Sequence, residues 1–274
     1  MLQLSEIWIY PIKSLGGIKL QQAQVTDRGL EHDRRWLLVD ENGLFQSQRE
    51  HPEMALFQTE IEGDFLSVTH RFKEDKIQIP LLQSFSENQK RIPVTVWDDT
   101  IEAYEVSKAA NDWFTKMLGL KVKLVYMPEN SHRKVSPKYA ITGNEINSFS
   151  DGYPFLVIGQ ASLEDLNSRL TTAVPMNRFR PNFVFTGGKP YEEESWKEIK
   201  IGTVSFFGVK PCGRCVVITI DQESGKKAGK DPLLALSKYR KVGNKVLFGQ
   251  NLLGVENGSL NVGDEVKVLS SNQS

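Results

Sequence analysis

The feature that most constrains the fold is an alternation of apolar and polar residues that begins near the N-terminus. It runs through four stretches separated by turn residues: 7–12, 18–26, 35–48 and 61–70. Successive side chains of a β-strand point to opposite faces, so a period of two indicates strands with one buried face. Asn42 and Gly43 form a dipeptide typical of a tight hairpin turn. The sequence therefore predicts an antiparallel β region over about the first hundred residues.

A helix is predicted over 107–119, directly after this β region. Five apolar residues recur near helical spacing: Ala109, Trp113, Phe114, Met117 and Leu118. Gly119 follows them and is expected to cap the C-terminal end, because glycine adopts the left-handed conformation needed there.

The second half of the chain begins with a segment, 128–154, that is rich in Ser, Asn, Gly and Pro and predicts a long surface loop. A helix is predicted over 162–170, with Ser162 as its N-cap and Asp165 three residues later. A short helix is expected to begin at Asp231. Strands are predicted over 155–159, 182–187, 201–209 and 215–221, and a hairpin-rich β segment over 251–270. The fold class is therefore mostly β with a few helices, or α+β.

Charge and cysteine content exclude several classes of protein. Lys plus Arg and Asp plus Glu are equal at 34 each, so no overall field favours nucleic acid or an anionic membrane as a stable partner. No apolar run approaches the roughly 18 residues that span a bilayer, and the first residues do not have the pattern of a signal peptide. With only 2 cysteines, the chain is expected in a reducing compartment, which we take to be the cytoplasm.

Both cysteines, Cys212 and Cys215, lie in the stretch 210–221. Three interpretations compete: a redox disulfide pair, half of a zinc site, or one thiolate that binds a soft metal while the other thiol packs. A thioredoxin-type pair needs a helix at its first cysteine, but the residues after Cys215 predict a strand. A zinc site needs four ligands, and no two of the 4 histidines form a close-spaced pair. Burial of both thiols as small hydrophobes also stays open.

Basic residues gather near Cys215 and at other predicted strand ends. Arg214 precedes Cys215 directly in a turn shaped by Gly213, which makes the thiol position electropositive. Arg180, at the start of an apolar strand, is placed to offer bidentate hydrogen bonds to a phosphate. Other basic residues stand in comparable places: Lys13, Arg34, Arg35 and Arg178. A thiolate with several Arg, Lys and Ser donors suits a phosphorylated cofactor that carries a soft metal.

Six fragments follow one another along the chain: YPIKSLGG, DRRWLLVDENG, RFRPNFVFTGG, SWKEIKIG, KPCGRCVVITID and LFGQNL. In this order they resemble the MOSC-domain molybdenum enzymes, closest to the amidoxime-reducing component type, and the match runs over nearly the whole chain. The resemblance implies an N-terminal MOSC β-barrel domain over 1–125, followed by a MOSC β-barrel domain over 126–274.

The resemblance also implies a molybdenum cofactor (Mo-molybdopterin), a pterin dithiolene with a phosphate, held in a cleft between the two domains. Cys215 would complete the coordination of the metal, which leaves Cys212 as a packing residue. Asp151 falls near the metal-site loop of this family, where it would carry or orient a proton. The residues implied in cofactor binding are Lys13, Ser14 and Arg34 in the first domain, and Arg180, Asn182, Gly213 and Arg214 in the second. Two departures are Gly213, where a serine is frequent, and Asn251, where some relatives have an aromatic residue.

The activity implied by the resemblance is reduction of N-hydroxylated small molecules, namely amidoximes, hydroxylamines and N-hydroxylated bases. The sequence has no cysteine-rich ferredoxin domain, so electrons are expected from a separate protein of the flavin reductase, ferredoxin or cytochrome type. Two rival interpretations stay open: a carrier that delivers the cofactor or sulfur without turnover, and a metal-free thiol oxidoreductase that needs both cysteines. Pyridoxal phosphate binding is a further property associated with the family.

Overall fold

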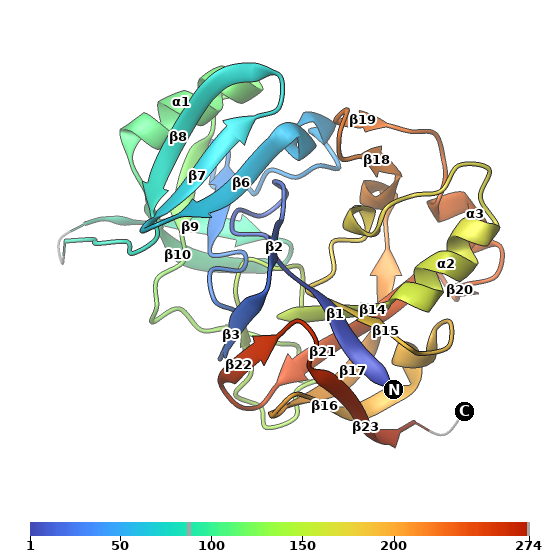
Figure 1. The fold of residues 1–274 in the computed structure, drawn as a ribbon. Helices are drawn as coiled ribbons and strands as arrows, with labels where there is room; N and C mark the ends of the chain where they lie inside the picture. Colours follow the sequence, from blue (N-terminus) through green and yellow to red (C-terminus); the bar gives the residue numbers. More distant parts are fainter. Residues whose placement is uncertain (87–88, 273–274) are drawn as a thin grey trace.

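A closed seven-stranded β barrel forms the larger part of the C-terminal half (Figure 1). The computed structural model describes residues 1–86 and 89–272. The barrel strands, in spatial order, are β14 (Phe155–Gly159), β15 (Phe183–Thr186), β1 (Leu2–Ile9), β23 (Glu265–Ser271), β16 (Trp196–Ile201), β17 (Val204–Arg214) and β21 (Lys245–Gly254). Antiparallel pairing of β21 with β14 closes the ring, and closure removes the exposed edges of an open sheet. Two short strands extend the sheet: β2 (Ile18–Leu20) beside β1, and β20 (Lys241–Val242) beside β21.

Two smaller sheets and a helix enclose a second core in the N-terminal half. The sheets are β5 (Trp36–Val39), β11 (Lys123–Tyr126), β10 (Asp99–Glu105) and β9 (Arg91–Val96), and β6 (Phe57–Glu62), β7 (Phe65–His70) and β8 (Lys73–Pro80). Trp36 of the first sheet and Phe57 of the second are fully buried in one cluster. Phe114 of α1 (Lys108–Leu118) packs in the same cluster. This arrangement is a half-barrel, and the predicted mostly β fold with a few helices is confirmed.

Strands from the start of the chain tie the two halves together. Strand β1 lies between β15 and β23 of the C-terminal barrel, where Leu4, Ile7 and Ile9 are buried in the barrel core. The small sheets are β3 (Gln22–Thr26) with β4 (Gly29–Leu30) and β22 (Gly258–Asn261), β12 (Arg133–Lys134) with β13 (Ile146–Asn147), and β18 (Ile220–Asp221) with β19 (Lys226–Lys227). Because the halves share strands, the domain boundary at 125/126 stays a prediction.

Helix α1 confirms the helix predicted over 107–119, with one correction. The Ser107 hydroxyl accepts a hydrogen bond from the Ala110 N–H at 3.1 Å, and Gly119 has a φ of 68°, as its role as a C-cap requires. The buried alanine is Ala110 rather than Ala109. The helical period of 3.6 residues places position 110 on the same face as Phe114.

Helix α2 (Gln160–Ser168) begins before the predicted position, so Ser162 is not its N-cap. The Ser162 hydroxyl instead donates to the carboxylate of Glu193, at 2.9 Å. Glu193 lies in a 3-10 turn, Glu192–Ser195. Helix α3 (Leu233–Ser237) is short and begins two residues after Asp231. Within residues 1–86 and 89–272, none of the helices is both long and apolar enough to cross a membrane.

Glu193 is a carboxylic acid enclosed by the protein. Its residue is 0% exposed, and its carboxylate also accepts a hydrogen bond from the Gly159 N–H at 3.2 Å. Burial disfavours the charged form and raises the pKa of Glu193 to about 7. Hydrogen bonds from Gly159 and Ser162 oppose this shift but do not cancel it.

We predict that Glu193 makes the protein less stable as the pH rises from about 5 to about 7.5. The folded-state pKa of Glu193 lies above its unfolded value, so the folded state holds the proton more tightly and its advantage is lost as the group ionises. The Glu193→Gln variant should gain up to about 3 kcal/mol in unfolding free energy relative to the native protein over this range. Urea unfolding at several pH values measures the difference. Glu164→Gln, at an exposed position of α2, is the control. If the unfolding free energies of Glu193→Gln and of the native protein changed in parallel with pH, the prediction would be contradicted.

Candidate active site

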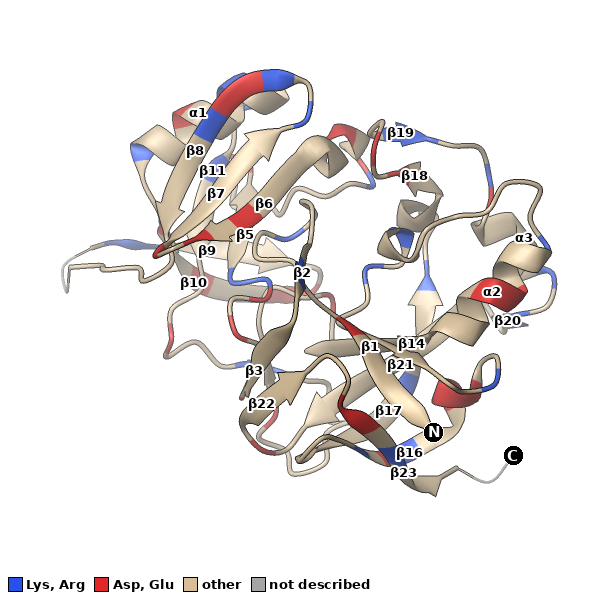
Figure 2. Cartoon of the chain, viewed as in Figure 1, with Lys and Arg blue, Asp and Glu red and all other residues tan. Residues whose placement is uncertain are grey.

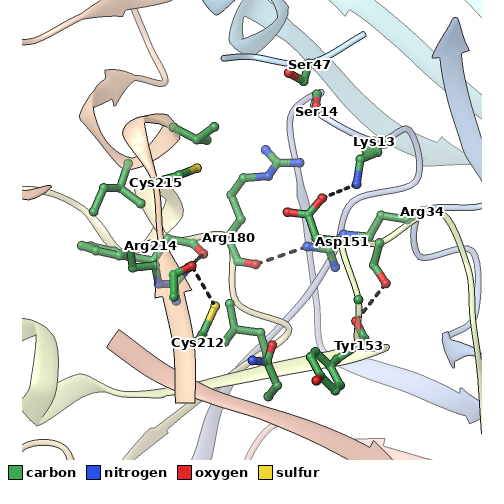
Figure 3. Close-up of a pocket in the computed structure, with 18 of the residues that line it drawn as sticks. Lys13, Ser14, Arg34, Ser47, Asp151, Tyr153, Arg180, Cys212, Arg214 and Cys215 are labelled. Carbon is green, nitrogen blue, oxygen red and sulfur yellow. Dashed lines mark hydrogen bonds and ion pairs between the residues drawn. The ribbon is translucent and has the colours of Figure 1, made fainter. Parts of the chain in front are cut away.

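A cavity of about 170 Å³ opens between the two halves of the structure. Both halves contribute to its wall, and Figure 3 shows Cys212, Arg214 and Cys215 facing Lys13, Asp151 and Arg34 across it. The site residues predicted from the sequence all line this cavity: Lys13, Ser14, Arg34, Asp151, Arg180, Asn182, Gly213, Arg214 and Cys215. Residues more than two hundred positions apart in the chain therefore meet at one place. Their individual roles stay predictions.

Cys215 follows the last residue of β17 and opens a 3-10 turn, Val216–Thr219. The strand predicted over 215–221 is therefore wrong for most of its length. The Thr219 hydroxyl donates to the Val216 carbonyl at 2.7 Å, and Ile218 is buried in an apolar cluster. Local hydrogen bonding and burial together outweigh the strand propensity of the β-branched residues.

Arg49 contacts the thiol of Cys215 from the N-terminal half. Its Nε atom lies 3.4 Å from the Cys215 Sγ, within hydrogen-bonding distance for sulfur. The Arg49 guanidinium is held over the ring of Trp97, 4.0 Å from the ring centroid, in a cation–π contact. Cys215 is thus half-buried beside a guanidinium group that is itself held in place by Trp97.

Cys212 lies within β17 and packs against the apolar cluster that includes Ile218. Burial raises the pKa of Cys212, with the positive charge of Arg214 opposing the shift. Both cysteines are free thiols. The two sulfurs therefore differ in environment, because Cys215 has a guanidinium partner and Cys212 has an apolar one.

Arg214 and Arg178 hold hydrogen-bond donors at the cavity that have no protein acceptor. Arg214 donates to the carbonyls of Phe248 and Phe179, at 2.8 and 2.9 Å, while its Nη2 has no partner among the described residues. Arg178 donates from Nη2 to Asp221 at 2.8 Å, while its Nε and Nη1 have none within that part of the chain. A buried donor without an acceptor costs about 1–3 kcal/mol. An anionic ligand in the cavity would satisfy these donors, so the residues fit a phosphorylated cofactor.

A buried ionic network joins Arg34 to the C-terminal half. The Asp33 carboxylate is 1% exposed and accepts hydrogen bonds from Arg34 at 2.6 Å and from the Asn182 amide at 3.1 Å. The Asn182 side-chain oxygen accepts in turn from Arg34 at 3.2 Å, and Arg34 Nη2 donates to the Arg180 carbonyl at 3.3 Å. Because each group is paired, the network can hold two loops from distant parts of the chain in one position.

Tyr10 contacts two of the arginines with its ring. Its ring centroid lies 4.4 Å from the guanidinium carbon of Arg34 and 4.2 Å from that of Arg180. Its hydroxyl donates to the Pro181 carbonyl at 3.1 Å, and burial raises the pKa of Tyr10 to about 12. Burial also lowers the pKa of Arg180 to about 10, so Arg180 is still a cation at neutral pH. The neutral phenol ring offers each of the two cations a cation–π contact.

The backbone of the site is strained at three of these positions. Ser14, Arg34 and Arg180 have φ values of 69°, 49° and 54°, in the left-handed region that favours glycine. Such conformations cost of the order of 1–3 kcal/mol each and persist where surrounding contacts impose them. The buried network described above provides those contacts for Arg34 and Arg180.

Asp151 and Lys13 form an ion pair at the opposite wall. Lys13 Nζ donates to Asp151 at 2.5 Å and to the Phe149 carbonyl at 2.8 Å. Desolvation lowers the pKa of Lys13 to about 8, although the charge of Asp151 raises it. For Asp151, desolvation would raise the pKa, but the charge and hydrogen bond of Lys13, together with a hydrogen bond from Trp97, hold it well below its usual range. Asp151 is thus ionised at neutral pH, whereas Lys13 begins to lose its proton slightly above neutral pH.

The loop that carries Asp151 makes more buried contacts than its polar composition predicts. Arg133 is 5% exposed and donates to the Ser148 carbonyl at 2.9 Å and to the Asp151 carbonyl at 3.2 Å. Phe149 is fully buried. The expectation of a surface loop over 128–154 is therefore wrong for its last part, because one buried arginine satisfies the carbonyl groups that a surface loop would leave to water.

Sequence reasoning missed several residues of the site. Arg49 stands in no recognisable motif, and Asp33 was noticed only as a letter of the DRRW fragment. Arg178 was noticed as a basic residue but not assigned to the site. Of the two departures, Asn251 lines the cavity and donates to the Lys210 carbonyl at 2.9 Å. At Gly213 an added Cβ would meet only the Lys245 side chain, at 3.6 Å, so a serine would also fit there.

The chain matches two family models: the MOSC N-terminal beta barrel domain over residues 1–121 and the MOSC domain over residues 144–267. It is 32% identical to mitochondrial amidoxime-reducing component 1 of Homo sapiens over 97% of this chain and 82% of that protein. It is 34% identical to molybdenum cofactor sulfurase of Arabidopsis thaliana over 90% of this chain, which covers only 32% of that protein. The crystal structure of the YUAD protein from Bacillus subtilis is similar over 100% of this chain and 98% of that one, with 9% identity and a TM-score of 0.45.

We predict that Asp33→Asn lowers the unfolding free energy by roughly 3 kcal/mol, because it leaves the charge of Arg34 without its buried partner. Chemical denaturation followed by tryptophan fluorescence measures this change. Glu41→Gln is the control, since Glu41 and its partner Lys121 are 62% and 73% exposed, and it should cost less than about 1 kcal/mol. Equal losses for the two variants would show that the buried network does not stabilise the fold.

Proposed function

The chain belongs to the MOSC family, and from this premise we propose that it binds the molybdenum cofactor and reduces N-hydroxylated compounds with electrons from a separate protein. One observation carries the proposal: the thiol of Cys215 stands at the wall of a cavity whose arginines hold unpartnered N–H donors. A thiolate is a ligand for a soft metal, and arginine is the preferred partner of a phosphate. The similarity to an amidoxime-reducing component over nearly the whole chain supports the reaction type.

We assign the parts of the cavity by their chemistry. Cys215 offers sulfur to the metal, with Arg49 holding the thiolate in place. Arg214, Arg178 and the cations around Tyr10 offer donors and positive charge to the phosphate and the pterin. Ser14, Asn182 and the Gly213 backbone N–H are uncharged groups within the same wall. When bound, the cofactor would supply two-electron oxygen-atom chemistry that side chains cannot perform.

The overall conversion requires two electrons and two protons for each substrate molecule. The N–O bond of the N-hydroxylated compound breaks, the nitrogen is reduced, and the oxygen leaves as water. Asp151 is ionised at neutral pH, so we assign it the orientation of the Lys13 ammonium and of a substrate N–H or O–H group rather than proton donation. Lys13, whose pKa is lowered to about 8, is the member of this pair that can release and regain a proton.

The electron donor follows from the same proposal, whereas the location rests on the two free cysteines, which indicate a reducing compartment. We infer a donor of the flavin reductase, ferredoxin or cytochrome type and a cytoplasmic location. The rival function is a carrier that holds the cofactor, or sulfur, without turnover of its own. Similarity to part of a molybdenum cofactor sulfurase is the observation that keeps this rival in view.

We predict that Cys215→Ser and Cys212→Ser behave differently when the protein is produced in a host that makes the cofactor. The native protein should contain close to one molybdenum per chain and should reduce benzamidoxime when supplied with a viologen radical. Cys215→Ser should lose reduction at least about 100-fold, because a metal ligand is removed. Cys212→Ser is the matched control and should keep its activity within about threefold, since its thiol packs in an apolar cluster.

Elemental analysis and benzamidine quantification together separate the alternatives. Equal loss of activity in both variants, without molybdenum, would favour the thiol oxidoreductase. Bound molybdenum without benzamidoxime reduction in the native protein would favour the carrier. Either result would contradict the proposed reductase.

A further inference from the structure

Positive charge is concentrated in one segment of a chain whose net charge is zero. Residues 226–245 contain six lysines and Arg240 but only one acidic residue, Asp231. The lysines are Lys226, Lys227, Lys230, Lys238, Lys241 and Lys245, and all are exposed. None of these lysines forms a salt bridge with any residue of the described segments, whereas Arg240 pairs with Glu194. Figure 2 shows β19 in blue and further blue positions on the loops beside α3, with red on the loop that leads into α3 and on the neighbouring α2.

Three of these lysines line a groove with apolar walls. The groove encloses about 560 Å³ and lies between the 3-10 turn after Cys215, helix α3 and the strands β20 and β21. Its apolar lining includes Val216, Leu233, Leu234 and Val246, and Lys227, Lys230 and Lys241 line its polar side. Val216 is 44% exposed and Leu234 is 45% exposed, so both apolar side chains are accessible to a partner. We call this feature the lysine groove.

The lysine groove and the active-site cavity share a wall. Arg214 lines both of them. Val216, which lines the groove, follows Cys215 directly in the chain. A molecule seated in the groove would therefore contact the 3-10 turn that follows Cys215.

We propose that the lysine groove docks an acidic electron-donor protein. This proposal rests on the proposed function, because only a redox enzyme needs such a partner. Unpaired exposed lysines around an apolar centre match the anatomy of a transient interface, in which the core is apolar and the charged rim steers the encounter. Steering of this kind needs opposite charge, so the docking face of the donor is rich in Asp and Glu.

Two other occupants of a basic surface fit less well. An anionic membrane takes up apolar side chains that protrude, but Leu233, Leu234 and Val246 line a hollow. A nucleic acid is held by contacts along its phosphates and by aromatic stacking, and the lining of the groove contains no aromatic residue. An apolar hollow instead accommodates a side chain that protrudes from a protein partner.

The test compares two triple variants with equal changes of charge. Lys227→Glu, Lys230→Glu and Lys241→Glu reverse the charge of the groove. Lys90→Glu, Lys134→Glu and Lys197→Glu are the matched control, because these lysines are also exposed, form no salt bridge with the described residues and line neither the groove nor the active-site cavity. The probes are a plant-type ferredoxin and the soluble haem domain of a cytochrome b5, two acidic one-electron carriers, titrated calorimetrically at about 20 mM and about 200 mM salt. Thermal unfolding checks that both variants are folded.

The native protein should bind at least one probe, and more weakly at the higher salt. Reversal of the groove should weaken binding at least about tenfold, whereas the control should change it less than about threefold. Donor-driven benzamidoxime reduction should fall in parallel, while viologen-driven reduction should stay unchanged in the groove variant. Because calorimetry does not depend on turnover, failure of viologen-driven reduction in the native protein would count against the proposed function and not against the docking site.

Three results would overturn the docking proposal. The first is equal affinity of a probe for the native protein and the groove variant. The second is absence of binding of both probes to the native protein at low salt. The third is binding of the native protein to phosphatidylglycerol vesicles that the groove variant loses while donor binding is unchanged, which would assign the lysine groove to a membrane surface.

Discussion

The buried pairing of Asp33 with Arg34 and Asn182 is the interaction on which the site depends. Asp33 and Asn182 are each 1% exposed, and they come from opposite halves of the structure. This pairing holds the loop that carries Arg34 against the loop that carries Arg180. The same contacts impose the left-handed backbone at both arginines, so the strain at the cavity wall is supported by a network with a high cost of disruption.

The mostly β fold could be predicted from the alternation of apolar and polar residues, whereas the residues of the site were predicted from the resemblance to the MOSC family. Alternation marked the strands, and basic residues such as Arg180 and Arg214 stood at their ends. The closed barrel then brings those ends together: β15 follows Arg180 and β17 ends at Arg214, and both strands belong to one ring. A loop residue placed by a barrel strand has little freedom in where its side chain can lie.

What could not be predicted depends on contacts across the chain. Arg49 is 166 positions from Cys215, and no local pattern marks such a pair. The turn after Cys215 was predicted as a strand because Val and Ile favour strands on average. In the structure, a hydrogen bond from the Thr219 hydroxyl and the burial of Ile218 decide the conformation instead. Asp33 was overlooked because a carboxylate is informative only once its burial is known.

Zero net charge likewise hides two positive regions that differ in kind. The arginines of the cavity are partly buried, anchored to carbonyl groups, and left with donors in fixed directions. The lysines of the groove are exposed and make no ion pair with the described residues. Fixed guanidinium groups suit a permanently bound anion, because the fold already holds them in the geometry that binding requires. Exposed ammonium groups suit a partner that must dissociate after each electron transfer. Attraction between exposed charges acts over long distances, but it is weak and screened by salt. Arg214 lines both regions, so the proposed cofactor and the proposed donor would meet at one side chain.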